Sequence, residues 1–300
     1  MNDLRERVPG HALVDELLRQ WDVGTIHVDS ATNKVVIDDE AVSWYRGVVG
    51  ERRVAELLSQ LSSDWTVLHS VPVGRGSSDI DHVVIGPAGI FTLNSKYSPG
   101  KRVWSSGDRL RVDGYSQKYV RNSMSEAERA SDLLSRAVGM TVPVTGLIVF
   151  VDPGDVKRGE SANAHDTAAT KVIADHELLA ILASRRLFSD EQVTRIVDRA
   201  VIPHTWHEKP VTSTIGRHIS REFEALEAAV GPQLAAAVKR PIKAPSPSRS
   251  RKTANRPPSR RPSNKRKPKQ SPLEKLMVGL VGPAAALAVA WGILNYMTSR

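Results

Sequence analysis

The stretch that most constrains this chain covers residues 77–96, SSDIDHVVIGPAGIFTLNSK. Two short apolar runs flank the turn-forming sequence Gly86-Pro87-Ala88-Gly89, so the stretch predicts a β-hairpin. Asp79 and Asp81 open the first strand, and Lys96 closes the second. A carboxylate can hold a divalent cation and a neighbouring lysine can stabilise a phosphate, so this pattern is typical of a metal-dependent phosphodiesterase site.

The alternation of side chains along a strand sets which of these residues can act together. In the first strand, Asp79 and Asp81 share one face, and His82 lies on the opposite face as a packing or surface residue. In the second strand, Asn94 and Lys96 share a face. The sequence therefore predicts that the polar groups of both strands meet at one end of the hairpin.

The remaining elements are predicted from hydrophobic periodicity. The run Ser189-Asp190-Glu191-Gln192 is a capping box that opens a helix. We expect helices over residues 4–20, 48–61, 116–138, 175–184 and 190–201, a hairpin over 25–37, a second over 103–112, and strands over 65–73, 79–85, 90–96, 144–151 and 172–173. This order predicts an α/β (α+β) fold with a mixed sheet flanked by helices.

Charge is distributed unevenly along the chain. Residues 239–270 contain 13 of the 42 Lys and Arg residues and no Asp or Glu, which leaves 29 basic against 33 acidic residues elsewhere, a balance of −4. The folded part is therefore not expected to be a basic nucleic-acid clamp. The basic segment is also rich in Pro and Ser and predicts a disordered linker. The absence of cysteine excludes disulfides and thiolate metal sites.

The stretch from Leu276 to Met297 carries no charged residue over 22 positions. This length can cross about 30 Å of hydrocarbon, which predicts a transmembrane helix, with a buried core helix as the alternative. Because the basic segment immediately precedes it, the positive-inside rule predicts a single-pass C-terminal anchor with the bulk of the chain in the cytoplasm. The basic segment is expected to attract anionic lipid, and the same charges can bind nucleic acid without sequence preference.

The hairpin and its surroundings resemble the NERD (nuclease-related domain) family. The resemblance extends from Gly47 to Leu134 and rests on the order and spacing of five pieces: Gly50-Glu51-Arg52-Arg53-Val54 on a helix, Asp79-Ile80-Asp81-His82-Val83-Val84-Ile85-Gly86-Pro87 on a strand, Gly89-Ile90-Phe91, Lys96, and Arg121-Asn122-Ser123 leading into a helix. It implies a restriction-endonuclease-like core with an Asp…(Asp/Glu)-x-Lys site. The expected regions are an N-terminal helix and hairpin extension (1–46), a NERD-like domain with a C-terminal helical extension (47–238), a disordered linker (239–272) and a membrane anchor (273–300).

The resemblance also implies a set of catalytic residues. Asp81, with Asn94 and Glu51, is expected to hold Mg²⁺ or Mn²⁺, and Lys96 is expected to stabilise the charge on the attacked phosphate. The superfamily has a carboxylate two residues before the lysine, and this chain has Asn94 there. An amide oxygen can ligate Mg²⁺ but brings no charge. Simpler roles remain open, because Asp81 can cap a turn and Lys96 can protect an edge strand.

A second group of polar residues is expected to contact nucleic acid or to support the metal ligands. It comprises Asp79, Gln117, Asn122 and Glu126. Asn122 and Glu126 are one helical turn apart and can face the site together. Helix capping is the alternative role for the residues near the start of that helix.

Two functions follow from these features. The first is a membrane-anchored, cytoplasmic, metal-dependent nuclease that hydrolyses nucleic-acid phosphodiesters. The second is a catalytically inactive nuclease-like module that binds or scaffolds at the membrane, and Asn94 in place of a carboxylate favours it. A membrane adaptor that recruits another protein is a third possibility. Replacing Asn94 by Glu discriminates the first two, because only an intact site would gain activity.

Overall fold

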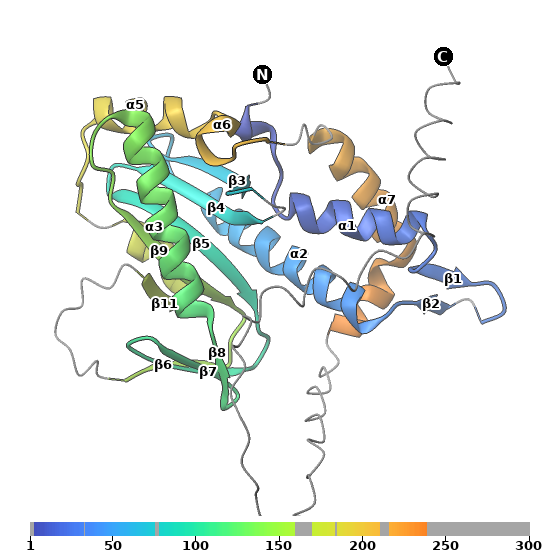
Figure 1. The fold of residues 1–300 in the computed structure, drawn as a ribbon. Coiled ribbons are helices and arrows are strands. Elements are labelled where there is room, and N and C mark those ends of the chain that lie inside the picture. The colour runs from blue at the N-terminus through green and yellow to red at the C-terminus, as the bar shows by residue number, and fades with distance from the viewer. Residues whose placement is uncertain are drawn as a thin grey trace, which may run out of the picture. The chain divides into compact units, whose positions relative to one another are not determined.

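The predicted hairpin lies at the centre of a five-stranded mixed sheet in the computed structural model of the chain (Figure 1). The sheet has the strand order β11-β9-β5-β4-β3. Strand β4 is antiparallel to both β3 and β5, whereas β5, β9 and β11 run parallel. The strands are β3 (Thr66–Pro72), β4 (Asp79–Gly86), β5 (Gly89–Tyr97), β9 (Val144–Val151) and β11 (Thr170–Ala174). The mixed α/β architecture expected from the sequence is thereby confirmed.

A glycine is required at the start of the hairpin turn by its packing. Gly86 pairs with Gly89 across the turn. A Cβ on Gly86 would lie 2.2 Å from the Trp65 ring, which is far inside van der Waals contact. The turn is also held from outside, since the Pro87 carbonyl accepts the backbone N–H groups of Leu187 and Phe188. The turn sequence therefore fixes the position of the hairpin as well as its connection.

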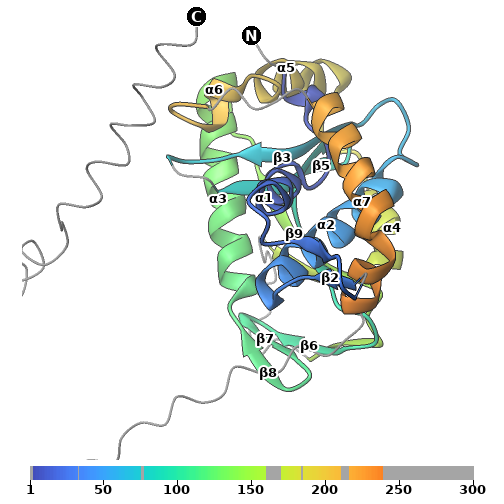
Figure 2. The same ribbon diagram turned by 90° about the vertical axis from the view of Figure 1, so that its right-hand side faces the viewer.

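Two long helices cover the two faces of the sheet, as Figure 2 shows. Helix α2 (Asp39–Leu58) packs Val54 and Leu58 against β4 and β5. Helix α3 (Tyr119–Val138) packs Ala127, Ala130 and Leu134 on the other side. The helix predicted over 48–61 begins nine residues earlier, where the Asp38 side chain caps it by accepting the Ala41 N–H at 2.7 Å.

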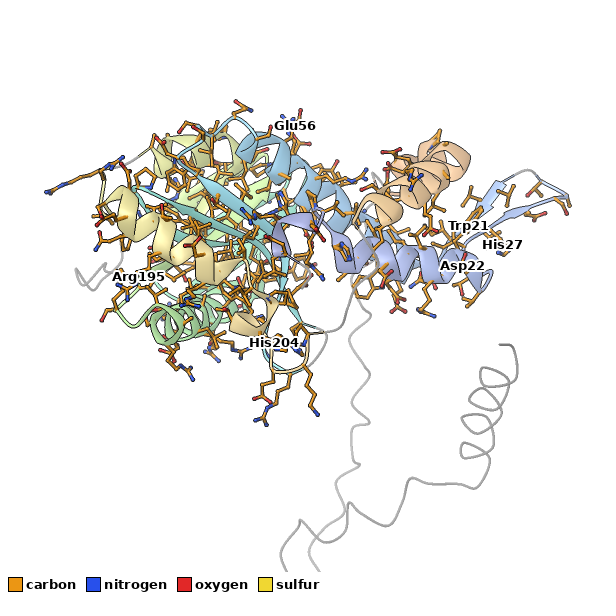
Figure 3. The ribbon with its side chains drawn as sticks, turned by 90° about the horizontal axis from the view of Figure 1, so that it is seen from above. Trp21, Asp22, His27, Glu56, Arg195 and His204 are labelled. Carbon is orange, nitrogen blue, oxygen red and sulfur yellow. The ribbon has the colours of Figure 1, made fainter. Side chains whose placement is uncertain are left out.

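The N-terminal extension packs on α2 together with a C-terminal helix. Helix α1 (His11–Asp22), the hairpin of β1 (His27–Asp29) and β2 (Lys34–Val36), and helix α7 (Gly216–Val238) share a hydrophobic cluster with α2. The single helix predicted over 4–20 is divided into a short 3-10 helix (Leu4–Glu6) and α1, because Gly10 adopts a left-handed conformation before α1. Figure 3 shows Trp21, Asp22 and His27 together at this end of the structure.

A second, smaller sheet lies at the foot of α3 (Figure 1). Its order is β10-β6-β7-β8, with β6 (Arg102–Ser106), β7 (Arg109–Val112), β8 (Tyr115–Gln117) and β10 (Asp155–Arg158). The β6–β7 hairpin was predicted, whereas β8 and β10 were not. Val103, Leu110 and Val112 pack against Ile148 and Phe150 of β9, which docks this sheet onto the central one.

Two shorter helices, α5 (Asp190–Ala200) and α6 (Pro203–Trp206), pack at the opposite end of α3. A third short helix, α4 (Leu178–Leu182), packs beside α2. The predicted capping box is present, with the Ser189 hydroxyl accepting the Gln192 N–H. Arg195 and His204 lie at this end in Figure 3.

The structure describes residues 3–32, 34–75, 78–159, 170–183, 185–210 and 216–238, all within one compact unit, Met1–Ala244. Among these residues, no helix combines the length and the apolar character needed to cross a membrane. The basic linker and the transmembrane stretch predicted over 276–297 lie outside the described residues.

Candidate active site

The polar end of the hairpin is a point where two strands separate. The β4–β5 ladder extends from Gly86–Gly89 to His82–Leu93 and includes no pair beyond it. Strand β5 continues to pair with β9 as far as Tyr97, and β4 continues to pair with β3 as far as Asp79. The first residues of β4 and the last residues of β5 are therefore not paired with each other through their backbones, and side chains occupy the place of the ladder.

Asp81 lies where β4 and β5 separate, beyond the His82–Leu93 pair, and we call this point the fork. Its Oδ2 accepts the backbone N–H of Ser95 at 2.6 Å, so the carboxylate replaces a missing ladder partner. Burial raises the pKa of Asp81 above its ordinary value, while Lys96 and the Ser95 hydrogen bonds act in the opposite direction. One carboxylate oxygen is thus fixed by the backbone.

Glu51 reaches the same region from α2. Its side chain is 5% exposed, and its Oε2 accepts the backbone N–H of Gly10 at 2.9 Å. Burial, followed by the nearby charges of Asp81 and Asp79, raises the pKa of Glu51 well above its ordinary value. Sequence similarity placed Glu51 in the site, and the structure brings it near both strand aspartates.

Asp79 is the third acid of the group. Burial and then the Asp81 charge raise the pKa of Asp79 to about 6, with Arg7 acting in the opposite direction. In β3, Ser70 lies between the partners of His82 and Ile80, adopts a left-handed φ of 45° and is fully buried. Its hydroxyl accepts the His11 N–H at 3.0 Å, so the N-terminal segment is fixed beside the acids.

Glu126 joins the group from α3. Burial and then the Asp81 charge raise the pKa of Glu126 to about 8, while Lys96 is the largest opposing charge. Its Oε1 is buried and has no hydrogen-bond partner in the described part of the chain. Near neutral pH this side chain therefore holds a proton when no cation is nearby.

Lys96 is the cation that these acids share. Its charge opposes the rise in the pKa of Glu51, Asp81 and Glu126. Its Nζ lies 5.2 Å from the centroid of the Tyr119 ring, at the start of α3. The Tyr119 ring therefore lies beside the lysine head group, between β5 and α3.

Three further residues were predicted for the site, and the structure gives only Asn94 a buried oxygen that is available to a ligand. Asn94 has a buried Oδ1 with no hydrogen-bond partner among the described residues. Asn122 is exposed on α3. Gln117 donates to the Tyr115 carbonyl at 3.4 Å, which is a local contact. Arg7, Gly10 and Ser70 were missed, because nothing local in the sequence shows that the N-terminal segment packs here.

His82 lies on the opposite side of β4, as the alternation of side chains predicted. It is fully buried, and its Nδ1 lies 2.8 Å from Nδ1 of His69. Burial lowers the pKa of His69 to about 4 and that of His82 well below its ordinary value. The pair is therefore uncharged near neutral pH and acts as core packing.

The donor atoms suit a hard divalent cation. Carboxylate and amide oxygens are the ligands that Mg²⁺ and Mn²⁺ prefer, and the unpartnered oxygens of Asn94 and Glu126 are available to one. The ligand atoms are of the right type, but they are not yet arranged around one point. In the described ranges, no three His, Cys, Asp or Glu side chains are placed to share one metal ion. A cation would therefore need side-chain movement to gather its ligands.

Comparison with known proteins gives one match. Residues 46–151 match the family model described as NERD, nuclease-related domain. This span contains every acid of the group described above, together with Asn94 and Lys96. Searches of curated proteins and of solved structures gave no match.

Proposed function

We propose that this chain, whose residues 46–151 match the nuclease-related domain family, hydrolyses nucleic-acid phosphodiesters with Mg²⁺ or Mn²⁺. The observation that carries the proposal is the group of four acids around Lys96, namely Glu51, Asp79, Asp81 and Glu126, each with a pKa raised above its ordinary value. Acids with strongly shifted pKa values cluster at functional sites. The hairpin geometry suits a restriction-endonuclease-like core.

The acid group is electrostatically incomplete without a bound cation. Lys96 acts on Glu51, Asp81 and Glu126, while Arg7 acts on Asp79 and Arg129 acts on Glu126. Burying unpaired charge is costly, so the acids take up protons instead. A divalent cation would let these groups ionise and would use the oxygen of Asn94 that has no partner among the described residues. This need for positive charge supports a metal site.

The proposed reaction assigns a task to each residue. Asp81, Asn94 and Glu51 would hold the cation, which when bound polarises the phosphate and lowers the pKa of a water molecule. The Ser95 N–H fixes one oxygen of Asp81 and so orients the other. Lys96 binds a phosphate oxygen and stabilises the negative charge that develops there. Glu126 accepts or returns a proton, since the pKa of its carboxyl lies at about 8 without the cation.

The second candidate function is a nuclease-like module that binds without cleaving. Two observations favour it. Asn94 is uncharged where the superfamily has a carboxylate, and one oxygen of Asp81 is already committed to the Ser95 N–H. In this alternative, the acids stabilise the fork between β4 and β5 and the domain contributes recognition alone.

The chain is further proposed to be anchored in a membrane. The support is the uncharged stretch of 22 residues over 276–297 and the 13 Lys and Arg residues over 239–270 that precede it. A span of that length suits a bilayer, and polybasic segments beside a span are attracted to anionic lipid. The folded domain would then act at the cytoplasmic face. Protease protection of the chain in sealed vesicles tests this orientation.

A cleavage assay on the full chain tests the catalytic proposal. Single-stranded and duplex DNA and RNA are incubated in Mg²⁺, Mn²⁺ or EDTA with the wild type, Asp81→Asn and Lys96→Ala. Lys101→Ala serves as the matched control, because Lys101 is an exposed lysine five residues away on the same segment. Metal-dependent cleavage that both site variants lose and the control keeps supports the nuclease. Absence of cleavage by folded protein on all substrates supports the binding module.

A further inference from the structure

The small sheet leaves one of its faces open to solvent. Its apolar side chains face inward, where Val103, Leu110 and Val112 are buried. The alternating positions on the central strands face outward and are exposed: Arg102 and Trp104 on β6, and Arg109 and Arg111 on β7. We call these four residues, with Lys157 of β10, the Trp104 face.

The Trp104 face has an aromatic side chain at its centre. Trp104 pairs directly with Arg111 on one side and with Lys157 on the other, so the three side chains form a row across three strands. The Arg111 guanidinium lies 5.7 Å from the centroid of the Trp104 ring. The indole is 37% exposed, so part of its surface remains open to a ligand.

The face is also strongly positive, in contrast to the acidic balance of the folded part as a whole. Four basic residues, Arg102, Arg109, Arg111 and Lys157, share it with one acid, Asp155, which pairs with Arg102 across the strands. No acidic side chain of the described chain lies within ion-pair distance of Arg102, Arg109 or Arg111, whereas Lys157 pairs with Asp155 at 3.6 Å. The charges of these three arginines are therefore not neutralised by an ion pair within the described residues, and they can interact with an anionic ligand.

We propose that the Trp104 face binds single-stranded nucleic acid and presents it to the acid group. Exposed aromatic rings stack on unpaired bases, and flanking arginines bind the phosphates. A duplex keeps its bases stacked inside and offers this indole no base to stack on. The nature of the ligand rests on the proposed function, but binding can be measured without any cleavage.

The face is joined to the acid group by short segments. Strand β5 carries Lys96 and ends at Tyr97, and four residues separate Tyr97 from Arg102, where β6 begins. On the other side, one residue separates β8 from α3, whose first residue, Tyr119, contacts Lys96. A strand bound across the Trp104 face therefore lies next to the segments that hold Lys96.

The test uses the full chain carrying Asp81→Asn, in EDTA, so that binding is measured without cleavage. Fluorescence anisotropy follows a labelled single-stranded oligonucleotide, a duplex of equal length, and vesicles of neutral and anionic lipid. Trp104→Ala and the triple variant Arg102→Gln, Arg109→Gln, Arg111→Gln are compared with Trp104→Phe, which keeps an aromatic ring. Arg199→Gln is the charge control, since Arg199 is exposed on α5 at the other end of α3. The basic linker is identical in all proteins.

We expect Trp104→Ala to weaken single-strand affinity by about tenfold and the triple variant by at least as much. Trp104→Phe and Arg199→Gln should bind as the parent does, and duplex affinity should fall less in Trp104→Ala. Unchanged single-strand affinity in both test variants would overturn the proposal, whatever the cleavage assay gives. A loss confined to anionic vesicles would also overturn it and identify a lipid-binding face. Circular dichroism melting confirms that each variant is folded.

Discussion

The carboxylate of Asp81 accepts the backbone N–H of Ser95 at 2.6 Å, at the point where β4 and β5 stop pairing. This bond links the first strand of the hairpin to the second through a side chain, and it places Asp81 beside Lys96, two residues after Asn94. The acid group around Lys96 is organised by this fork. We therefore expect the charge of these side chains to control both the stability of the domain and its chemistry.

Glu126→Gln should stabilise the cation-free protein at alkaline pH. Burial raises the pKa of Glu126 from 4.5 to about 8. A raised pKa means that the folded state binds the proton more tightly, so this contribution to stability is complete below about pH 4.5 and is lost as pH rises through about 8. Gln cannot ionise and avoids that loss. Urea unfolding from about pH 5 to about pH 9 should show a gain of up to a few kcal/mol at the alkaline end.

The matched control for Glu126→Gln is Glu128→Gln, an exposed acid on the same helix. It should leave the pH dependence of unfolding as in the wild type. An equal gain from Glu126→Gln at both ends of the pH range would show that titration of Glu126 is not the cause.

Asn94→Asp should strengthen cation binding and raise any metal-dependent cleavage. It restores the carboxylate that the superfamily has at this position, and Mg²⁺ prefers carboxylate oxygens. Without a cation, a fifth buried acid should lower the free energy of unfolding near neutral pH, so the variant should regain stability when Mn²⁺ is added. Thermal melting with and without Mn²⁺ measures both the loss of stability without the cation and its recovery when the cation is added. A variant destabilised equally in both conditions would argue against a metal at Asn94.

Glu51→Ala should cost more stability than Glu51→Gln. The Glu51 side chain accepts the Gly10 N–H in a buried position, and Ala leaves that donor without a partner, at a cost of about 1–3 kcal/mol. Gln retains an acceptor oxygen for that donor and has nearly the same shape as Glu. Hydrogen exchange at Gly10 should accelerate in Glu51→Ala alone. Equal exchange rates in the two variants would mean that this bond does not hold the N-terminal segment.

Gly86→Ala should destabilise the domain by about 1–3 kcal/mol through overpacking. The new Cβ would lie 2.2 Å from the Trp65 ring, so the indole must move. Gly231→Ala is the control, because its Cβ would meet Glu227 at an ordinary 3.6 Å inside a helix. It should be neutral or slightly stabilising. Chemical unfolding of both variants measures the difference, and a neutral Gly86→Ala would show that Trp65 adapts.

The hairpin and its flanking elements could be predicted because their signals are local. Alternating apolar residues and the Gly86–Gly89 turn determine two strands, and alternation correctly placed His82 opposite Asp81. The capping box at Ser189 likewise marked the start of α5. Secondary structure that depends on neighbouring residues can therefore be predicted from the sequence alone.

The contacts around the acids could not be predicted, since they join distant segments. Gly10 and Glu51 are 41 residues apart, and no pattern in either segment indicates their hydrogen bond. Burial of Glu126 depends on how α3 packs on the sheet, so similarity suggested a supporting role but not its raised pKa. The parallel pairing of β10 with β6 joins strands about fifty residues apart and was missed for the same reason.

Binding of Mn²⁺ tests the central claim most directly. Electron paramagnetic resonance measures free Mn²⁺ during titration of the full chain, the variant Asp81→Asn and the exposed control Asp108→Asn. The account predicts saturable binding near pH 8 that Asp81→Asn weakens at least tenfold, that Asp108→Asn leaves intact, and that fades at about pH 5 as the acids take up protons. Equal Mn²⁺ binding by the wild type and Asp81→Asn would contradict a metal site at the fork.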